Sequence, residues 1–332
     1  MGKLFYMICF DLEGPLSPQD NAYEVMRLAE NGGAVFEALS EYDDILALEN
    51  REGYEPGDTL KLIVPFLQYY GITENDIKNV SKTAVLVNGM DTTIDWIIDE
   101  GIPVRIISTS YEQHAYSIGE RLKIPPSDIA STRLNLADLL DEEIVLRLKQ
   151  IEKEILSKGL SEKCVKLLDT LYFSYGLFNK IKIRVVGGQR KVDALLNFAK
   201  DQGVDIENVI AIGDSITDFK MLREVSKGGG LSIAFNANQY CLPYANVSLA
   251  TLDGRALIPI LNEFFKEGKS AALTLTEKFE KTPDQMNDYP VLQKLDAPPS
   301  FSIIPKSGDI RSILPIHTDM RMKVRGEAGK LG

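Results

Sequence analysis

The hydrophobic positions of this chain gather in four short runs that are apolar at nearly every position. The runs cover residues 4–10, 104–107, 209–212 and 231–235. A short run of this kind, bounded by a loop, is typical of a parallel strand that is buried on both faces of a sheet. We therefore predict four buried strands. The polar residues that follow them are Asp11, Ser108, Asp214 and Asn236.

Helical periodicity separates these runs. Apolar residues recur three and four positions apart before the second, third and fourth run, at residues 91–99, 191–200 and 219–225. Strands that alternate with helices across short loops predict an α/β fold with a doubly wound parallel sheet. Ligands of such sheets bind beyond the carboxyl ends of the strands. The polar residues after the four runs are therefore the first candidates for a functional site.

Two longer helical stretches interrupt the alternation and define the expected domains. Residues 17–85 lie between the first two strands and predict a helical cap. Residues 138–180 predict a second helical insert, which would pack on the core or on a partner. The α/β core is then expected over residues 1–16 and 86–265.

The last part of the chain, residues 266–332, differs in pattern. It is rich in proline and shows little helical period, so we treat it as a C-terminal extension of unknown role that wraps the core, binds a partner or is disordered. The apolar pieces 301–304 and 313–314 indicate that part of it docks on the core. This extension and residues 138–180 are the two segments through which we expect any protein partner to bind.

Composition narrows the function classes. The net charge is −11 and no dense Lys/Arg cluster occurs, so we expect no nucleic-acid partner. The run 4–10 is too short for a membrane span or a secretory signal, which predicts a cytoplasmic protein. The three cysteines share no CxxC spacing and the two histidines lie far apart, which argues against a disulfide framework, a zinc site and histidine-based catalysis.

The first strand is followed by two carboxylates, Asp11 and Glu13. Two neighbouring carboxylates can divide the work of catalysis: one stays ionised and attacks, while the other gives a proton and then removes one. The third strand is followed by Asp214 and Asp218 in the segment GDSITD. Carboxylates from two strand ends can jointly hold a hard cation such as Mg²⁺. A solvated turn and a helix start are the simpler interpretations of these two pairs.

Two further groups suit a phosphate. A hydroxyl after the second strand can donate to a phosphate oxygen, and Ser108, Thr109 and Ser110 compete for this role. Lys191 begins a predicted helix, where its charge opposes the helix dipole and favours an anionic partner. Arg190 is the alternative carrier of this charge.

The order of these elements resembles the haloacid dehalogenase (HAD) superfamily of phosphohydrolases, in its phosphoserine-phosphatase-like branch, with an archaeal member as one candidate. The resemblance covers about residues 5–20, 86–112 and 181–250, and the segment GLSIAFNA adds to it. It implies a HAD-like Rossmannoid sheet with a helical cap inserted after the first strand.

The resemblance also implies roles for the candidate residues. Asp11 would attack phosphorus and form an aspartyl-phosphate, while Glu13 would protonate the leaving oxygen and then activate water. Ser108 or Thr109 would hold the phosphoryl group together with Lys191. Mg²⁺ would be bound by a set of four residues: Asp11, the backbone carbonyl of Glu13, Asp214 and, in support, Asp218.

Two positions depart from the usual pattern of that family, and one cap residue is a candidate for specificity. Glu13 stands where the family usually has Asp, with the same carboxylic chemistry. Pro15 replaces a Thr, which removes a hydroxyl and a backbone donor from the loop. In the cap, Glu24 is a positional candidate for contacting the substrate.

The expected function is thus Mg²⁺-dependent hydrolysis of a small phosphorylated metabolite. A phosphotransferase and a non-catalytic regulatory subunit of a larger complex are the alternatives.

Overall fold

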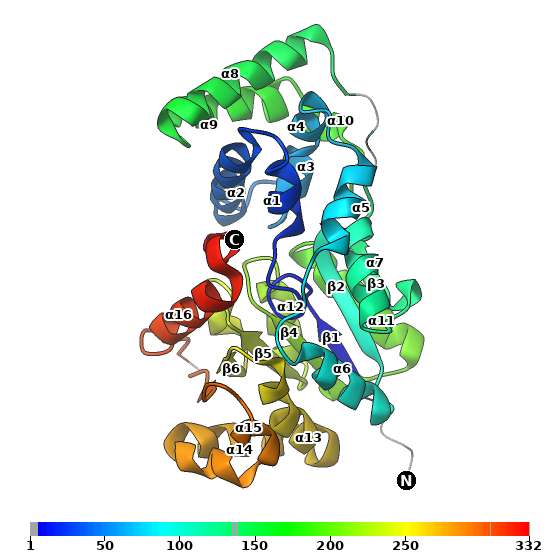
Figure 1. The fold of residues 1–332 in the computed structure, drawn as a ribbon, viewed down its shortest axis with the longest axis vertical. Coiled ribbons are helices and arrows are strands. Elements are labelled where there is room, and N and C mark those ends of the chain that lie inside the picture. The colour runs from blue at the N-terminus through cyan, green and yellow to red at the C-terminus, as the bar shows by residue number, and fades with distance from the viewer. Residues whose placement is uncertain (1–5, 135, 137–138, 306, 332) are drawn as a thin grey trace.

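A seven-stranded sheet forms the centre of the protein. The computed structural model describes residues 6–134, 136, 139–305 and 307–331. The strand order is β3-β2-β1-β4-β5-β6-β7. The strands are β1 (Met7–Phe10), β2 (Val104–Tyr111), β3 (Ile129–Thr132), β4 (Val209–Gly213), β5 (Leu231–Phe235), β6 (Val247–Ala250) and β7 (Ser300–Ile303). Strands β1 to β6 are parallel and β7 is antiparallel to β6, which confirms the predicted α/β sheet (Figure 1).

The four predicted strands correspond to β1, β2, β4 and β5, with one correction. Strand β2 continues to Tyr111, so Ser108 lies inside the strand and does not follow it. Residues 4 and 5 of the first run lie outside the described part of the chain. Strands β3, β6 and β7 were not predicted, because each has only four residues and mixes hydroxyl with apolar side chains.

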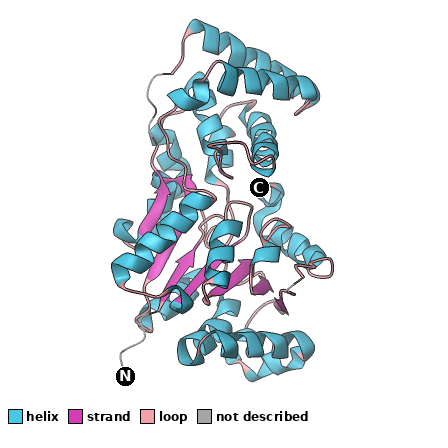
Figure 2. Ribbon diagram, turned by 180° about the vertical axis from the view of Figure 1, so that it is seen from behind, coloured by secondary structure: helices cyan, strands magenta, loops and turns pink. Residues whose placement is uncertain are grey.

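Helices cover both faces of the sheet (Figure 2). The core helices are α6 (Met90–Asp99), α7 (Glu112–Arg121), α11 (Gln189–Gln202), α12 (Phe219–Lys227) and α13 (Ile258–Glu267). Two hydrophobic clusters lie on the two faces: one contains Ile8 and Phe10, and the other contains Met7 and Cys9. Alternate side chains of β1 therefore point to opposite faces of the sheet, and the side chains on both faces are fully buried. This explains why its sequence is apolar at every position.

The cap and the second insert form one hydrophobic cluster above the strand ends. The cap helices are α1 (Asn21–Met26), α2 (Gly32–Leu48), α3 (Thr59–Leu62), α4 (Val64–Tyr69) and α5 (Glu74–Lys82), and the insert helices are α8 (Glu142–Lys158), α9 (Glu162–Asp169) and α10 (Leu177–Lys180), with a π-helical turn at Thr170–Ser174. The Tyr42 hydroxyl donates to Asp169 at 2.7 Å across their interface. The insert thus packs on the cap (Figure 1).

A loop of the cap, residues 55–58, lies directly on the core. Gly57 has φ +94°, and a Cβ there would lie 2.7 Å from a methyl carbon of Thr109 and 3.1 Å from one of Thr217. Glu55 accepts from Lys220 at 2.7 Å and from the backbone N–H of Gln189 at 2.9 Å. The cap is therefore closed over the carboxyl ends of the strands.

The C-terminal extension docks on the core along its length. Its helices are α14 (Lys269–Lys281), α15 (Pro290–Gln293) and α16 (Leu314–Arg325), which the weak helical period did not predict. The apolar piece 301–304 does dock: Phe301 is buried in β7, beside β6. Helix α16 is fixed by His317, whose Nδ1 accepts from the backbone N–H of Ala237 at 2.9 Å.

The end of the extension reaches the cap. Leu331 packs against the hydrophobic cluster of the cap, and the C-terminal end lies next to α2 in both ribbon views (Figures 1 and 2).

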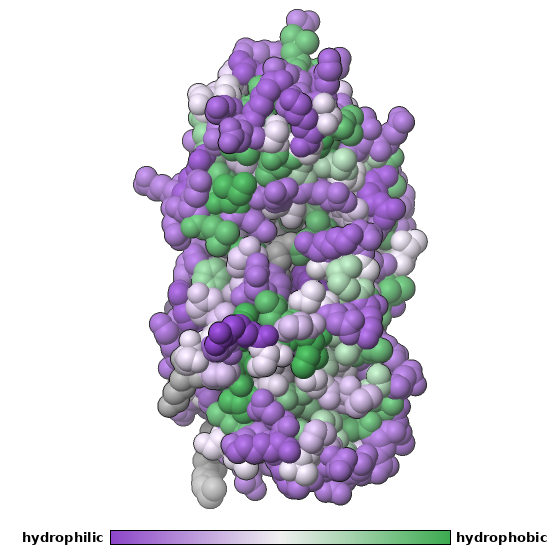
Figure 3. Space-filling view, turned by 90° about the vertical axis from the view of Figure 1, so that its left-hand side faces the viewer, coloured by the Kyte–Doolittle hydropathy of each residue, from purple (hydrophilic) through white to green (hydrophobic). Residues whose placement is uncertain are grey.

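Seen from the side that carries α16, the surface is mainly polar, with apolar residues in small separate patches (Figure 3). Short 3-10 turns complete the fold at Pro126–Asp128, Ile206–Asn208, Leu242–Tyr244, Gly254–Leu257, Pro283–Asp288 and Gly326–Lys330. No helix in the described part is long and apolar enough to cross a membrane.

Candidate active site

Asp11 lies at the carboxyl end of β1, in the middle of the sheet. Its backbone N–H donates to the carbonyl of Ile212 in β4 at 2.8 Å, which joins the ends of the two strands. Its carboxylate accepts from the Nζ of Lys191 at 2.6 Å, and both side chains are buried. Burial and the neighbouring carboxylate of Asp218 raise the pKa of Asp11 to about 7, although Lys191 acts against this rise.

Lys191 is fully buried in the first turn of α11 and also donates to Asp218 at 2.7 Å. Burial acts to lower its pKa, but the charges and hydrogen bonds of Asp11 and Asp218 outweigh burial and raise it above its usual value. Arg190, the alternative carrier of this charge, points elsewhere and pairs with Asp58 of the cap at 2.6 Å. Lys191 is therefore the cation that meets Asp11.

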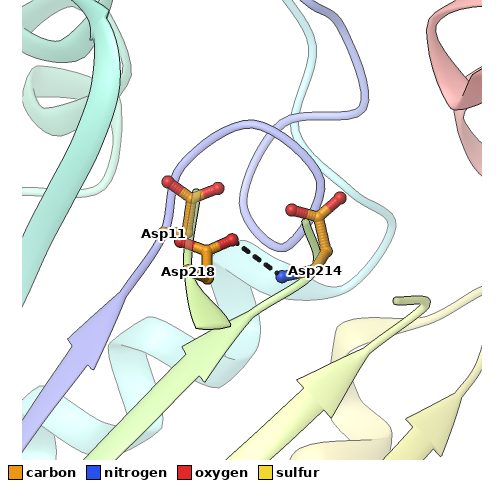
Figure 4. A group of neighbouring side chains, drawn as sticks. All are labelled: Asp11, Asp214 and Asp218. Atoms are coloured by element: carbon orange, nitrogen blue, oxygen red, sulfur yellow. Dashed lines mark hydrogen bonds between the residues drawn. The ribbon is translucent and has the colours of Figure 1, made fainter. Parts of the chain in front are cut away.

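Three aspartates gather at the ends of β1 and β4 (Figure 4). Asp11, Asp214 and Asp218 each offer one carboxylate oxygen, and these oxygens lie within 4.8 Å of one another. Asp218 accepts from the backbone N–H groups of Asp214 and Ser215 at 3.0 and 3.1 Å, which shapes the loop. The Oδ1 atom of Asp214 is buried and has no hydrogen-bond partner among the described residues. An oxygen-only donor set of this kind suits Mg²⁺.

Glu13 lies on the loop that follows β1, beside the aspartates. Its Oε1 accepts from the backbone N–H of Asn21 at 2.9 Å. Burial and the charge of Asp20 raise the pKa of Glu13 well above its usual value. A buried histidine, His114 on α7, has its Nε2 3.8 Å from Glu13 Oε1. Burial lowers the pKa of His114 to about 3, so this histidine is neutral at physiological pH.

The loop after Glu13 keeps its shape without a donor at Pro15. The backbone N–H groups of Leu16 and Ser17 both donate to the carbonyl of Leu12, at 3.0 and 2.8 Å. Gly14 has φ +122°, and a Cβ at this position would clash with the carboxylate of Asp214. The backbone donor that proline removes is therefore not needed to close this turn.

The hydroxyl groups of β2 divide between two environments. Ser108 is fully buried, and its Oγ is 2.7 Å from that of Ser110. The Oγ1 of Thr109 is buried and has no partner among the described residues, and Thr109 lines a cavity together with Asp11 and Glu13. Thr109 thus has the free hydroxyl at this cavity.

That cavity is small and lies between core, cap and extension. Its volume is about 80 Å³. The residues around it come from the strand ends (Asp11, Glu13, Thr109, Ser215, Ile216 and Thr217), from the cap (Asp20, Phe36, Ser40, Asp43, Gly57, Thr59 and Leu60) and from the C-terminal extension (Arg321, Arg325 and Leu331). Glu24, the predicted cap candidate, is not among them: its carboxylate is half-exposed and pairs with Arg27 at 3.5 Å on α1.

Two arginines of α16 enter the site, and nothing in the sequence indicated them. Arg321 and Arg325 both form ion pairs with the Oδ2 of Asp214, the second at 2.8 Å. Their side chains are buried, with 4% exposed in each case. No motif surrounds them in the sequence, and their partner lies more than 100 residues earlier, so no local signal could have identified them.

Comparison with known proteins establishes the family to which this chain belongs. Residues 68–251, more than half of the chain, match the model of the haloacid dehalogenase-like hydrolases. The chain belongs to this family. The matched range covers Lys191, Asp214 and Asp218 of this chain and begins after Asp11.

Individual relatives agree with this assignment. Over 122 residues the chain is 27% identical to a phosphoserine phosphatase of Archaeoglobus fulgidus. The matched part makes up 33% of this chain and 34% of that enzyme, so the chain spans about a third of the length of this curated relative. A solved structure, the gene product AF1437 of Archaeoglobus fulgidus, superposes with a TM-score of 0.82 at 27% identity and covers 99% of both chains.

A more distant structure shares the fold. A phosphoserine phosphatase, solved as an analogue of its phospho-aspartyl intermediate, superposes with a TM-score of 0.54 at 19% identity. The match covers 77% of the present chain and 99% of the chain of that phosphatase. The HAD-like fold expected from the motif order is thereby confirmed, as is the likeness to the phosphoserine-phosphatase branch.

Proposed function

We propose that this hydrolase is a Mg²⁺-dependent phosphomonoesterase whose nucleophile is Asp11. One observation carries the proposal: the buried carboxylate of Asp11 contacts Lys191 at 2.6 Å and lies in one cluster with Asp214 and Asp218. Phosphoryl transfer depends on a positioned nucleophile and on positive charge at the transferring group. The cluster would thus contain the nucleophile Asp11, the cationic side chain of Lys191 and the carboxylates that bind the metal cation.

Asp11, Asp214 and the backbone carbonyl of Glu13 would hold the metal ion. The unpartnered Oδ1 of Asp214 supports this, because a buried carboxylate oxygen without a donor is ready to bind a cation. Asp218 would act in support, since its carboxylate already binds Lys191 and the loop. When bound, Mg²⁺ would neutralise negative charge on the aspartates and on the phosphate oxygens.

The reaction would proceed in two steps. A carboxylate oxygen of Asp11 attacks phosphorus, the ester P–O bond breaks, and Glu13 donates its proton to the departing alkoxide. Glu13 then removes a proton from water, which attacks the aspartyl-phosphate and releases inorganic phosphate and free Asp11. The raised pKa of Glu13 supports this role, because it favours the protonated acid that the first step needs.

The phosphoryl group would be held by Lys191 and by a hydroxyl of β2. The free hydroxyl of Thr109 at the cavity favours Thr109 for this contact. Ser108 would then support the last part of β2 through its hydrogen bond with Ser110. Replacing Thr109 by Val, which keeps the shape and removes the hydroxyl, should weaken phosphate binding more than Ser108→Ala does.

The substrate would be a small phosphorylated metabolite. The cavity of about 80 Å³ is far smaller than the roughly 300–1,000 Å³ of ordinary ligand pockets, so the cap must open for a substrate to enter. Phosphoserine is one candidate because a phosphoserine phosphatase is among the relatives. Glu24 does not line the cavity: its half-exposed carboxylate pairs with Arg27, so α1 would have to move for Glu24 to contact a substrate there.

Release of phosphate from a panel of phosphomonoesters, measured with Mg²⁺ and with EDTA, tests the proposal. Turnover should require the metal and should be abolished in Asp11→Asn. Asp95→Asn is the matched control, because this carboxylate is half-exposed and pairs with Lys123 outside the site. A panel that yields no phosphate under any condition would contradict the proposal.

The role of Glu13 has its own test. Glu13→Gln should lower turnover by about 10²–10⁴-fold, as expected for the loss of a general acid and base. With p-nitrophenyl phosphate, whose leaving group needs no proton, the variant should still form the aspartyl-phosphate and accumulate it. Mass spectrometry of the acid-quenched protein should then detect one added phosphoryl group. Its absence would assign Glu13 another role.

A non-catalytic regulatory subunit is the second candidate, and the two arginines on Asp214 favour it. This candidate predicts that the protein neither binds Mg²⁺ nor releases phosphate. A phosphotransferase is distinguished by adding an alcohol acceptor: phosphate that still goes only to water contradicts it.

A further inference from the structure

Helix α16 brings two positive charges to the aspartate cluster from the far end of the chain. Arg325 contacts Asp214 Oδ2 through Nη1 at 2.8 Å, and Arg321 contacts the same oxygen through its own Nη1. Guanidinium groups that converge on one carboxylate oxygen leave the other oxygen available. Asp214 Oδ1 is that other oxygen: it is buried without a hydrogen-bond partner among the described residues, in a carboxylate that clusters with those of Asp11 and Asp218.

Backbone carbonyls hold both arginines in this position. Arg321 donates from Nε to the carbonyl of Gly329 and from Nη2 to that of Leu331, both at 2.9 Å. Arg325 donates from Nε to the carbonyl of Pro18 at 3.1 Å, on the loop that leads from Glu13 into the cap. The contact with Asp214 therefore depends on the docked conformation of the whole end of the chain.

The balance of charge at the site changes with this contact. The carboxylates of Asp11, Asp214 and Asp218 meet there beside the carboxyl group of Glu13, and Lys191 of the core contacts Asp11 and Asp218. Arg321 and Arg325 add two positive charges directly on a predicted metal ligand. Like charges repel strongly at such distances in a buried site, so each arginine opposes a divalent cation on the other oxygen of Asp214.

We infer that the C-terminal helix controls the affinity of the aspartate cluster for its divalent cation. Docking of α16 weakens cation binding, and cation binding weakens the docking of α16 by the same factor, because coupling between two binding events is reciprocal. Arg325 is the positioning residue that transmits this coupling. The inference rests on the metal site of the proposed function, and its tests use metal binding and exchange rather than turnover.

Calorimetric titration of the full chain with MgCl₂ tests the coupling. Arg325→Met should bind Mg²⁺ roughly tenfold more tightly than the wild type, since it removes one charge at close range. Arg325→Lys retains the charge and should stay within about twofold of the wild type. Lys323→Met is the matched control: it removes a charge from the same helix, but Lys323 is half-exposed and pairs with Asp319. Thermal melting would confirm that each variant is folded.

The possible results separate the inference from the proposed function. A wild type that binds no Mg²⁺ beside an Arg325→Met variant that does would support the inference in its strongest form. Equal or weaker binding by the variant would overturn the inference and leave the phosphatase proposal intact. Absence of Mg²⁺ binding in every variant would overturn both.

Hydrogen exchange of the wild type tests the reciprocal effect without any substitution in α16. Mg²⁺ at a concentration that saturates the site should speed exchange in residues 314–331, compared with NaCl at equal ionic strength. Asp11→Asn should lose most of this effect, because it removes a metal ligand while the pairs on Asp214 remain. Exchange that is unchanged or slowed by Mg²⁺ would overturn the coupling.

Discussion

Two segments cover the strand ends of this protein, and they contribute different things. The cap loop, residues 55–58, borders the cavity with Gly57, which lies close to the methyl groups of Thr109 and Thr217, while its ion pairs through Glu55 and Asp58 involve residues that do not line the cavity. The C-terminal extension meets the core through two buried arginines on Asp214. The cap loop therefore shapes the cavity, whereas the extension changes its charge. The cap, which determines the shape of the cavity, is inserted directly after β1. The additional positive charge on Asp214 comes from α16, near the other end of the chain.

Replacing Arg321 by Met should have the largest effect on stability. The guanidinium is buried and has backbone partners that would lose their donor as well as Asp214. Breaking a buried ion pair from one side costs about 3–5 kcal/mol. Urea unfolding should show a loss of this order. A loss below about 1 kcal/mol would mean that Arg325 alone holds Asp214.

Replacing Gly57 by Ala should have a somewhat smaller effect. The new Cβ would lie 2.7 Å from Thr109 Cγ2, and the backbone is at φ +94°. Strain and overpacking together should cost about 2–3 kcal/mol and displace the cap loop from the cavity. Gly53→Ala is the matched control in the same loop region: its φ is +75° and no atom lies within 4 Å of the new Cβ. Equal melting temperatures of the two variants would contradict the prediction.

The attachment of α16 should depend on pH through His317. Burial lowers the pKa of His317 to about 4, and its Nδ1 must be neutral to accept from Ala237. Between this value and the unfolded value near 6.5, the unfolded chain binds the additional proton. Stability from this group is therefore complete above about pH 6.5 and is lost as pH falls, by at most roughly 1.4 kcal/mol per pH unit.

Unfolding of His317→Gln at pH 7.5 and pH 5 measures this contribution. The variant should be less stable than the wild type at pH 7.5, and the gap should narrow at pH 5. A gap that stays constant or widens would contradict the assignment.

The pair between Lys220 and Glu55, which ties the cap loop to α12, should have the smallest effect. Both side chains are about one-fifth exposed, at 23% and 20%, so water screens their attraction. Lys220→Met should cost about 0.5–1 kcal/mol. Calorimetric melting with Lys330→Met as a fully surface control, where the partner is Glu327, would measure the difference.

The core of the site could be predicted because its elements are local. A strand buried on both faces is apolar throughout, so β1, β4 and β5 were evident from four or five residues each. The polar residue after such a strand lies at the ligand-binding edge of the sheet, which identified Asp11 and Asp214 as neighbours. The structure places them in one cluster.

Other parts of the site could not be predicted from local patterns. The end of β2 was placed too early, because Ser108 and Thr109 continue the strand although their side chains are polar. The extension was expected to have little helix, because its helical faces are buried only against a core that a local pattern does not include. The sequence argued against a role for histidine because His114 and His317 lie far apart in the chain, and no local pattern places His114 near Glu13, where the structure has it.

The sequence by itself determined the α/β class, the ends of β1 and β4 and the carboxylates that follow these two strands, because strand burial and loop chemistry are set within a few consecutive residues. Only the tertiary structure decided which hydroxyl of β2 is free, how the cap closes and which cations reach the aspartates. Those outcomes depend on contacts between segments far apart in the chain. The ion pairs of Asp214 with Arg321 and Arg325 exist only once the whole molecule is folded.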